Sequence, residues 1–216
     1  MELKTIFLIL FAAASVLHLV SLLIKNGILR VITKCALMPF LLGMYFFGAQ
    51  NVFWPIVAAL VLGCAGDVFL LKIESLTRFR CGLASFLLGH LAYIIAFIHF
   101  AQPFNLNALA VSFVAAIAFG ITMYKIVHPN REMKLPVVVY ETVITAMAIL
   151  AFQVFLQKGF PLGTFIFGGS LLFLVSDSFL ARFTFGTKPK YGDFWVMLTY
   201  ILAQFCIVWG FCGLTE

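Results

Sequence analysis

The sequence predicts an all-helical bundle that crosses a membrane several times, and three observations support this fold class. The chain of 216 residues is 64% hydrophobic and 10% charged, and its mean hydropathy of +1.13 lies outside the range of water-soluble domains. Its apolar residues gather into stretches of about 20, the length that a helix needs to cross a hydrocarbon core. The run 108–121 is apolar on every face, which indicates helices and not β-barrel strands.

We expect eight spans, and each is bounded by polar or turn-forming residues. The predicted spans are 5–24, 32–48, 53–71, 79–99, 107–127, 135–156, 162–182 and 194–213. Lys25 ends the first span, which has a nearly neutral N-terminus and therefore resembles a retained span more than a cleaved signal peptide. The connections that follow contain Gln50-Asn51, the basic segment 72–80, Pro103-Phe104-Asn105, His128-Pro129-Asn130, Lys158-Gly159-Phe160-Pro161 and the basic segment 182–190. One transmembrane domain, 1–216, is therefore expected.

The positive charges predict the orientation of the chain. Twelve of the fourteen Lys and Arg residues fall in alternate connections, and short basic loops are retained on the cytoplasmic side. With eight spans, both termini would then be non-cytoplasmic. The net charge of +6 is explained by this topology and by contact with anionic membrane lipids, so no nucleic-acid partner is expected. The compact chain is typical of a bacterial inner-membrane protein, and its oligomeric state is left open. The five cysteines form no CxxC pair and suggest packing residues.

Ionisable residues lie inside four of the predicted spans, in the same half of the membrane. Counted from the basic residue at the cytoplasmic end of each span, Asp67, Asp177 and Glu141 lie five to seven residues deep, or roughly 7 to 11 Å. His90 lies ten residues deep, or roughly 15 Å. Each intramembrane charge is unfavourable by on the order of 2.5–3.5 kcal/mol unless it faces a polar interior. We therefore expect these groups to face one another and to form a site, although interhelical hydrogen bonds that only hold the bundle together are the simpler alternative.

Two segments of the sequence correspond to each other, which gives a reason for two aspartates at matching depth. A shift of 110 residues places Asp67 on Asp177, and a polar residue follows 23 positions later in each case, His90 or Tyr200. Gln204 lies one helical turn beyond Tyr200 on the same face. This pattern suggests a 4+4 parallel repeat with the polar cluster at its interface.

Five ordered motifs resemble those of the lysoplasmalogenase family, also called the YhhN family, from about Lys34 to Gln204. They are Gly66-Asp67 with Leu70, Gly89-His90 with Tyr93, Tyr140-Glu141, Ser176-Asp177-Ser178 with Leu180-Ala181, and Thr199-Tyr200 with Ala203-Gln204. One departure is visible, because the family pattern leads us to expect a Lys-Pro pair early in the second span, whereas Cys-Ala-Leu-Met separates Lys34 from Pro39 here.

The resemblance implies a multi-span hydrolase that cleaves the vinyl ether bond of lysoplasmalogens, releasing a fatty aldehyde and a glycerophospho-alcohol. The substrate would be an alkenyl-glycerophosphoethanolamine or -choline. The resemblance and the shared depth of the acids indicate Asp67, Asp177, Glu141 and His90 as catalytic residues, with His90 as a proton relay or as the group that orients a carboxylate. The residues expected to bind substrate are Tyr93, Tyr140, Ser176, Tyr200, Gln204 and Lys34. The reaction needs a carboxylic acid that protonates carbon and an ionised carboxylate that stabilises the oxocarbenium ion and activates water. The sequence does not assign these two roles to particular acids.

Three alternatives remain on the sequence alone. Zinc catalysis usually needs at least three protein ligands, and only one histidine lies at the right depth, so we expect neither a metal nor another cofactor. Nucleophilic catalysis by Ser176 or Ser178 lacks a second, properly placed base. A transporter for a small amphiphile or for protons could use the same buried acids, but polar groups in both halves of the bilayer would be expected for it.

Overall fold

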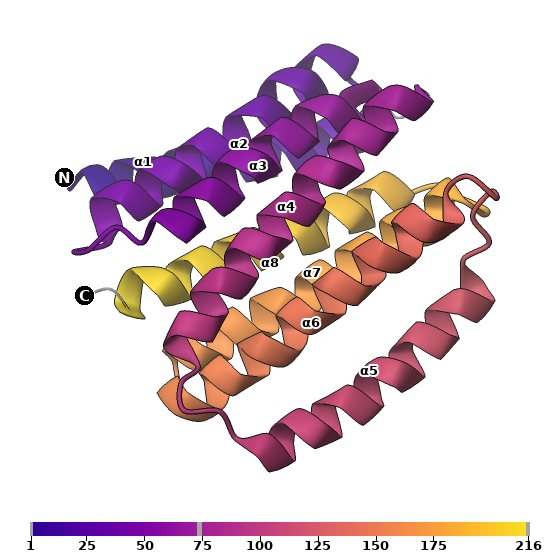
Figure 1. Cartoon of the computed structure of the whole chain (residues 1–216). Coiled ribbons are helices and arrows are strands. Elements are labelled where there is room, and N and C mark those ends of the chain that lie inside the picture. Colours follow the sequence, from indigo (N-terminus) through magenta and orange to yellow (C-terminus); the bar gives the residue numbers. More distant parts are fainter. Residues whose placement is uncertain (1, 73–74, 215–216) are drawn as a thin grey trace. The chain divides into compact units, whose positions relative to one another are not determined.

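The computed structural model describes residues 2–72 and 75–214, and within them it contains eight α-helices, one short 3-10 helix and no strand. The α-helices are α1 (Leu3–Leu23), α2 (Gly27–Gly48), α3 (Trp54–Phe69), α4 (Leu76–Phe100), α5 (Leu106–Ile126), α6 (Lys134–Lys158), α7 (Leu162–Thr184) and α8 (Gly192–Leu214) (Figure 1). The 3-10 helix η1 (Leu70–Lys72) directly follows α3. The predicted all-helical class and the predicted order of eight helices are confirmed.

Seven helices of this described part are long and apolar enough to cross a membrane, and α3 is the exception with 16 residues. At 1.5 Å per residue α3 is about 24 Å long, a little less than a hydrocarbon core of about 30 Å. The largest difference from the predicted limits is the start of α2, five residues earlier than expected. Asn26 explains it, because its side chain accepts a hydrogen bond from the backbone N–H of Leu29 and caps the helix.

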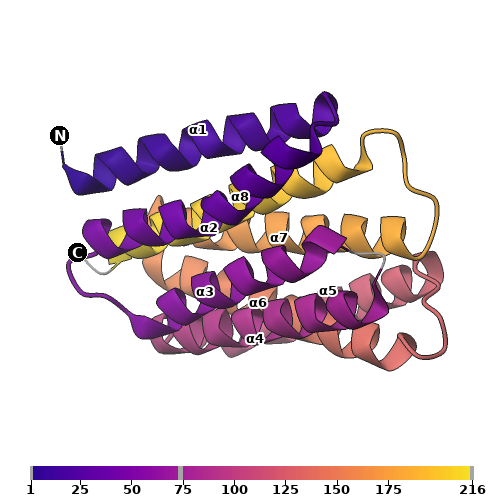
Figure 2. The same ribbon diagram turned by 90° about the horizontal axis from the view of Figure 1, so that it is seen from above.

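The chain divides into two compact units. Unit 1 contains the residues up to Ala96 and those from Phe211 onward, and unit 2 contains Phe97 to Gly210. In unit 1, α1 packs against α2 and α2 against α3. Figure 2 shows the chain reversing between α1 and α2, so that these two helices run side by side. In unit 2, α6 packs against α7 and α5 against α6. Each unit thus holds three whole helices and most of a fourth, while the 4+4 repeat stays a prediction.

Apolar side chains at helical spacing form the core of each unit. In unit 1, α2 buries Leu37, Leu41 and Met44 along one face. In unit 2, α6 buries a comparable row that includes Ile144, Met147 and Ala151. In contrast, Met123 is the one residue of α5 that is buried. This helix lies at the edge of unit 2 beside α6 (Figure 1). Exposed apolar residues on such a helix are expected where lipid is the solvent.

Small residues and serine hydroxyls bring neighbouring helices together in both units. A Cβ on Gly66 of α3 would lie 2.6 Å from the ring of Phe86 on α4. A Cβ on Gly169 of α7 would lie 2.8 Å from the carbonyl oxygen of Ala203 on α8, so a larger residue would push these helices apart. The Ser85 hydroxyl of α4 donates to the Leu62 carbonyl of α3 at 2.7 Å. These contacts hold the helices that carry Asp67 and Asp177 against their neighbours.

Candidate functional site

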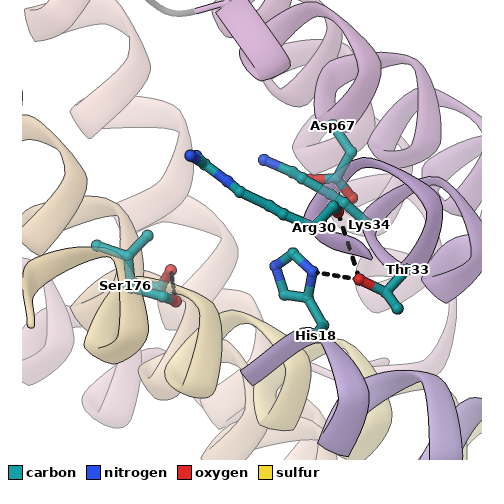
Figure 3. Close-up of polar contacts among 7 residues, drawn as sticks. His18, Arg30, Thr33, Lys34, Asp67 and Ser176 are labelled. Carbon is teal, nitrogen blue, oxygen red and sulfur yellow. Dashed lines mark hydrogen bonds and ion pairs between the residues drawn. The ribbon is translucent and has the colours of Figure 1, made fainter. Parts of the chain in front are cut away.

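Asp67 forms a buried ion pair in unit 1. Its carboxylate lies near the end of α3, and Oδ1 is 3.5 Å from Nζ of Lys34 on α2. The side chains are 3% and 8% exposed, so water screens this pair weakly. Figure 3 shows Lys34 beside the Asp67 carboxylate, with Arg30 extending from the preceding turn of α2. Because the ammonium group supplies a counter-charge, Asp67 can remain ionised inside the membrane.

The pairing explains why a lysine stands inside the second span. Lys34 lies eight residues beyond the cap of α2, and four residues separate it from Pro39. From the sequence, Lys34 is expected to bind substrate, and its pairing with Asp67 is not predicted. A signal was present, because a lysine within a predicted span requires an acidic partner or access to the interface.

A histidine of α1 extends the polar surroundings in unit 1. His18 is fully buried, and its Nδ1 lies 2.9 Å from Oγ1 of Thr33 on α2 (Figure 3). The Thr33 hydroxyl donates to the carbonyl of Leu29, so Nδ1–H of His18 is the donor to Thr33 and Nε2 is an acceptor. This Nε2 is buried and has no hydrogen-bond partner within the described chain. The sequence did not single out His18 as a site residue.

His90 and Tyr93 occupy the interior of α4. Both side chains are 1% exposed, and they lie three residues apart on one face of the helix. They belong to unit 1, together with Lys34 and Asp67. Their predicted roles, proton relay or orientation for His90 and substrate contact for Tyr93, stay predictions.

Asp177 is held by a tyrosine in unit 2. The hydroxyl of Tyr140 on α6 donates a hydrogen bond of 2.5 Å to Oδ2 of Asp177 on α7. Tyr140 is 8% exposed, and its ring fills space in the interior of the unit. Each predicted catalytic aspartate therefore has a polar partner on the helix that precedes its own in the chain: α2 for Asp67 and α6 for Asp177.

Three further predicted residues of unit 2 are buried on α7 and α8: Ser176, Tyr200 and Gln204. The Ser176 hydroxyl donates to the carbonyl of Val196 at 3.0 Å, which ties α7 to α8. Tyr200 packs edge-to-face on Phe173, with 5.5 Å between ring centroids. Gln204 is 1% exposed and lies one turn beyond Tyr200. Ser176 thus has a structural hydrogen bond, and the roles of all three in substrate binding stay predictions.

Glu141 points in a different direction from its neighbour Tyr140. It lines a pocket of about 550 Å³ at the end of α5 and the start of α6, together with Lys125, His128 and Lys134. Oε1 of Glu141 is buried and has no hydrogen-bond partner among the residues that the structure describes. From the sequence, the basic residues of this connection are explained by membrane topology, and no pocket is predicted there.

The described residues contain no group of three or more His, Cys, Asp and Glu side chains arranged to hold a metal ion. The polar arrangement is therefore one of carboxylates held by a lysine or a tyrosine, inside a bundle of membrane-spanning helices.

These features define a multi-pass membrane protein with one buried aspartate, Asp67, and one partly buried aspartate, Asp177. The family comparison shows to which family the chain belongs. The model of the YhhN family matches residues 29–211, so the chain belongs to the YhhN family. This confirms the resemblance drawn from the motifs.

Curated relatives carry the name of an enzyme. The chain is 29% identical to lysoplasmalogenase TMEM86B of Rattus norvegicus over 151 residues, covering 70% of this chain and 58% of the relative. It is 28% identical over 155 residues to the protein of the same name in Mus musculus, covering 72% and 62%. It is 30% identical over 149 residues to that of Homo sapiens, covering 69% and 59%. The chain thus spans about three fifths of the length of these relatives. No solved structure matches it significantly.

Proposed function

We propose that this protein hydrolyses the vinyl ether bond of lysoplasmalogens within a membrane. The observation that carries the proposal is the pair of aspartates inside the helices, Asp67 held by Lys34 and Asp177 held by Tyr140, in a member of the YhhN family. The relatives named lysoplasmalogenase support the same activity. A transporter is not favoured, since these relatives all carry the name of a hydrolase.

The proposed mechanism uses carboxylates as general acid and base. A carboxylic acid transfers its proton to the outer carbon of the C=C bond, which leaves an oxocarbenium ion at the adjacent carbon. Water adds to this carbon and gives a proton to a carboxylate, forming a hemiacetal. The C–O bond to glycerol then breaks, the glycerol oxygen takes a proton and the aldehyde is released. Positioned acids and bases of this kind typically contribute about 10²–10⁴-fold in rate.

The contacts of the two aspartates suggest how these roles are divided. Asp67 has a lysine counter-ion, which favours the ionised carboxylate that stabilises a cation and activates water. Asp177 accepts the Tyr140 hydroxyl through Oδ2, and this hydrogen bond stabilises the carboxylate that remains after the acid has given its proton to carbon. We assign the base role to Asp67 and the acid role to Asp177, with Glu141 and His90 as the remaining predicted catalytic residues. Tyr93, Tyr140, Ser176, Tyr200, Gln204 and Lys34 remain the residues proposed to contact substrate or to orient these groups.

The proposed setting is the inner membrane of a bacterium, with the basic connections in the cytoplasm and both termini on the other side. Such an orientation gives the acids access to lipid of the cytoplasmic leaflet. The test is incubation of the purified full chain with a lysoplasmalogen and, separately, with the ester-linked lysophospholipid of equal chain length. We expect fatty aldehyde from the first and no cleavage of the second. Absence of aldehyde from folded protein would contradict the proposal.

A further inference from the structure

A second, apolar cavity lies along the same two helices as the pocket that contains Glu141. This cavity measures about 300 Å³ and is lined by α5, α6 and α7, with Ala116 and Phe119 from α5, Thr145 and Phe152 from α6 and Leu174 from α7 among its walls. On α5, Phe119 lines the apolar cavity and Met123, four residues later, lines the polar pocket. On α6, Glu141 and Thr145 have the same spacing.

Residues four apart lie one above the other on a helix face, so the two cavities follow each other in one row along α5 and α6. We name it the α5–α6 groove. On α5 it runs from Lys125 back to Val111, which corresponds to about 21 Å at 1.5 Å per residue. One leaflet is about 15 Å deep, half of a hydrocarbon core of about 30 Å, so the groove is long enough for one lipid chain. Both cavity volumes lie at or above the lower end of the range of about 300–1,000 Å³ for ligand sites.

Along its length, the groove changes from charged to apolar residues, in the same order as the head group and the chain of a lipid. Lys125, His128 and Lys134 surround its outer end, where a phosphate group would meet two ammonium groups. Glu141 lies seven residues deeper on α6 than Lys134, or roughly 10 Å. Beyond Glu141 the walls are mostly aliphatic and aromatic. A hydrocarbon chain fits this inner part, and a glycerol group falls at the level of Glu141.

Glu141 provides a reason to prefer one class of lipid. Its buried Oε1 has no hydrogen-bond partner within the described chain, and a buried acceptor without a donor is unfavourable. A lysophospholipid carries a free hydroxyl on the middle glycerol carbon, which can donate to the Glu141 carboxylate that lines the pocket. In a two-chain phospholipid that hydroxyl is esterified and has no proton to donate. A site that hydrogen-bonds a substrate hydroxyl rejects analogues without it by about 10⁴–10⁵-fold in the strongest cases.

We propose that the α5–α6 groove binds a single-chain lysophospholipid, with its phosphate at Lys125 and Lys134, its free glycerol hydroxyl on Glu141 and its chain along the apolar part. This inference rests on the proposed function and names the element that selects the one-chain substrate. The bond between glycerol and chain then lies between Glu141 and Thr145. Leu174 of the groove wall is three residues before Asp177 on α7, so the groove passes within one helical turn of the proposed acid.

The experiment uses a lipid that binds but cannot be cleaved, so that binding is measured independently of hydrolysis. The probe is a saturated alkyl-ether lysophospholipid with a diazirine in its chain, added to the purified full chain. We expect light-induced cross-links within 111–119 and 145–152 and competition by unlabelled lysophospholipid. Equal competition by a two-chain phospholipid would mean ordinary lipid contact and would overturn the proposal, as would cross-links confined to other helices.

Matched variants test each part of the groove. Ala116→Phe fills the apolar part, whereas Ala118→Phe adds the same ring at an exposed position of α5 that does not line it. We expect at least about tenfold weaker probe binding in the first and unchanged binding in the second, since a tenfold loss corresponds to 1.4 kcal/mol. Lys125→Gln and Lys134→Gln should each weaken binding by a similar factor, and Lys158→Gln, at the opposite end of α6, should not. Equal binding in all five variants would overturn the proposal.

Glu141 is tested by selectivity and not by activity alone. Glu141→Leu should reduce the preference for one-chain over two-chain lipid by at least about tenfold, because the acceptor oxygen is lost. Glu141→Gln keeps an acceptor oxygen and should retain most of the preference. An unchanged preference in Glu141→Leu would exclude this residue from recognition of the hydroxyl. Retained binding without aldehyde formation from a true lysoplasmalogen would instead contradict the proposed function while supporting the groove.

Discussion

Lys34 of α2 and Asp67 of α3 form an ion pair of 3.5 Å in which both side chains are almost entirely buried. A buried pair of this kind often adds little to stability compared with apolar residues of similar size, because both charges lose their hydration. Removal of one partner is more damaging, because it leaves the other charge uncompensated. The pair therefore affects both the stability of unit 1 and the proposed activity of Asp67. Mutations of the two residues can separate these effects.

We predict that Lys34→Met destabilises the protein by about 3–5 kcal/mol, because Asp67 is left without its counter-charge. The double variant Lys34→Met with Asp67→Leu should recover most of the lost stability, whereas aldehyde formation should stay abolished. Thermal unfolding in detergent and turnover of lysoplasmalogen measure the two effects. If the double variant were as unstable as the single one, the pair would have a structural role beyond charge neutralisation.

The hydrogen bond from Tyr140 to Asp177 predicts a difference between two tyrosines. Tyr140→Phe removes a hydrogen bond of 2.5 Å to the proposed acid. This acid becomes a carboxylate as it gives up its proton, and hydrogen bonds to charged groups contribute about 1.5–3 kcal/mol. We expect turnover to fall by about 10- to 100-fold, which is that energy converted at 1.4 kcal/mol per tenfold. Tyr200→Phe keeps the ring that packs on Phe173 and should have a milder effect. Equal effects of the two substitutions on turnover would argue against a special role for the Tyr140 hydroxyl.

Because α3 is short, the number of helices that cross the membrane needs its own experiment. The orientation of the chain depends on this number. If all eight helices cross the membrane, the connection near Asn51 and the connection near Lys188 lie on opposite sides, with Lys188 in the cytoplasm. Single cysteines at Asn51 and Lys188, in a chain whose native cysteines are replaced by Ala, can be labelled with a reagent that does not cross membranes. Labelling of Lys188→Cys from outside intact cells would show that the predicted orientation is reversed.

The helices were predictable because each is a long apolar run between polar connections, and the lipid environment leaves the backbone few alternatives. The first limit of the prediction was at α2. Basic residues at its start lower the local hydropathy, although the Asn26 cap places them within the helix. The second was at α3, where apolar residues continue beyond Phe69 into a 3-10 turn, so that hydropathy overestimates the helix length.

For the candidate site, sequence position indicates the depth of a residue in the membrane but not the direction in which its side chain points. Tyr140 and Glu141 are adjacent in sequence and equal in depth, yet successive residues on a helix point about 100° apart, as follows from 3.6 residues per turn. Tyr140 therefore contacts Asp177, whereas Glu141 faces the groove beside α5. The direction of each of these two side chains depends on how α6 packs against α5 and α7. A helix that is apolar on every side has no polar stripe from which this packing could be predicted. Lys34 was named from a motif, but its partner could be identified only once α2 was packed on α3.

The catalytic assignment leads to the last prediction: Asp67→Asn and Asp177→Asn should each reduce aldehyde formation by at least about 10²-fold, since positioned acids and bases contribute about 10²–10⁴-fold. Asn preserves the shape of the side chain but cannot exchange a proton. Activity is to be compared at equal amounts of folded protein, and binding of the uncleavable alkyl-ether probe shows that the substrate site is intact. Because Asp67→Asn also removes one charge of the ion pair with Lys34, its unfolding temperature must be measured in parallel. A chelator added to the unmodified protein tests the metal alternative, and loss of activity that zinc restores would favour it. Near-normal turnover in either Asn variant would remove that aspartate from the mechanism.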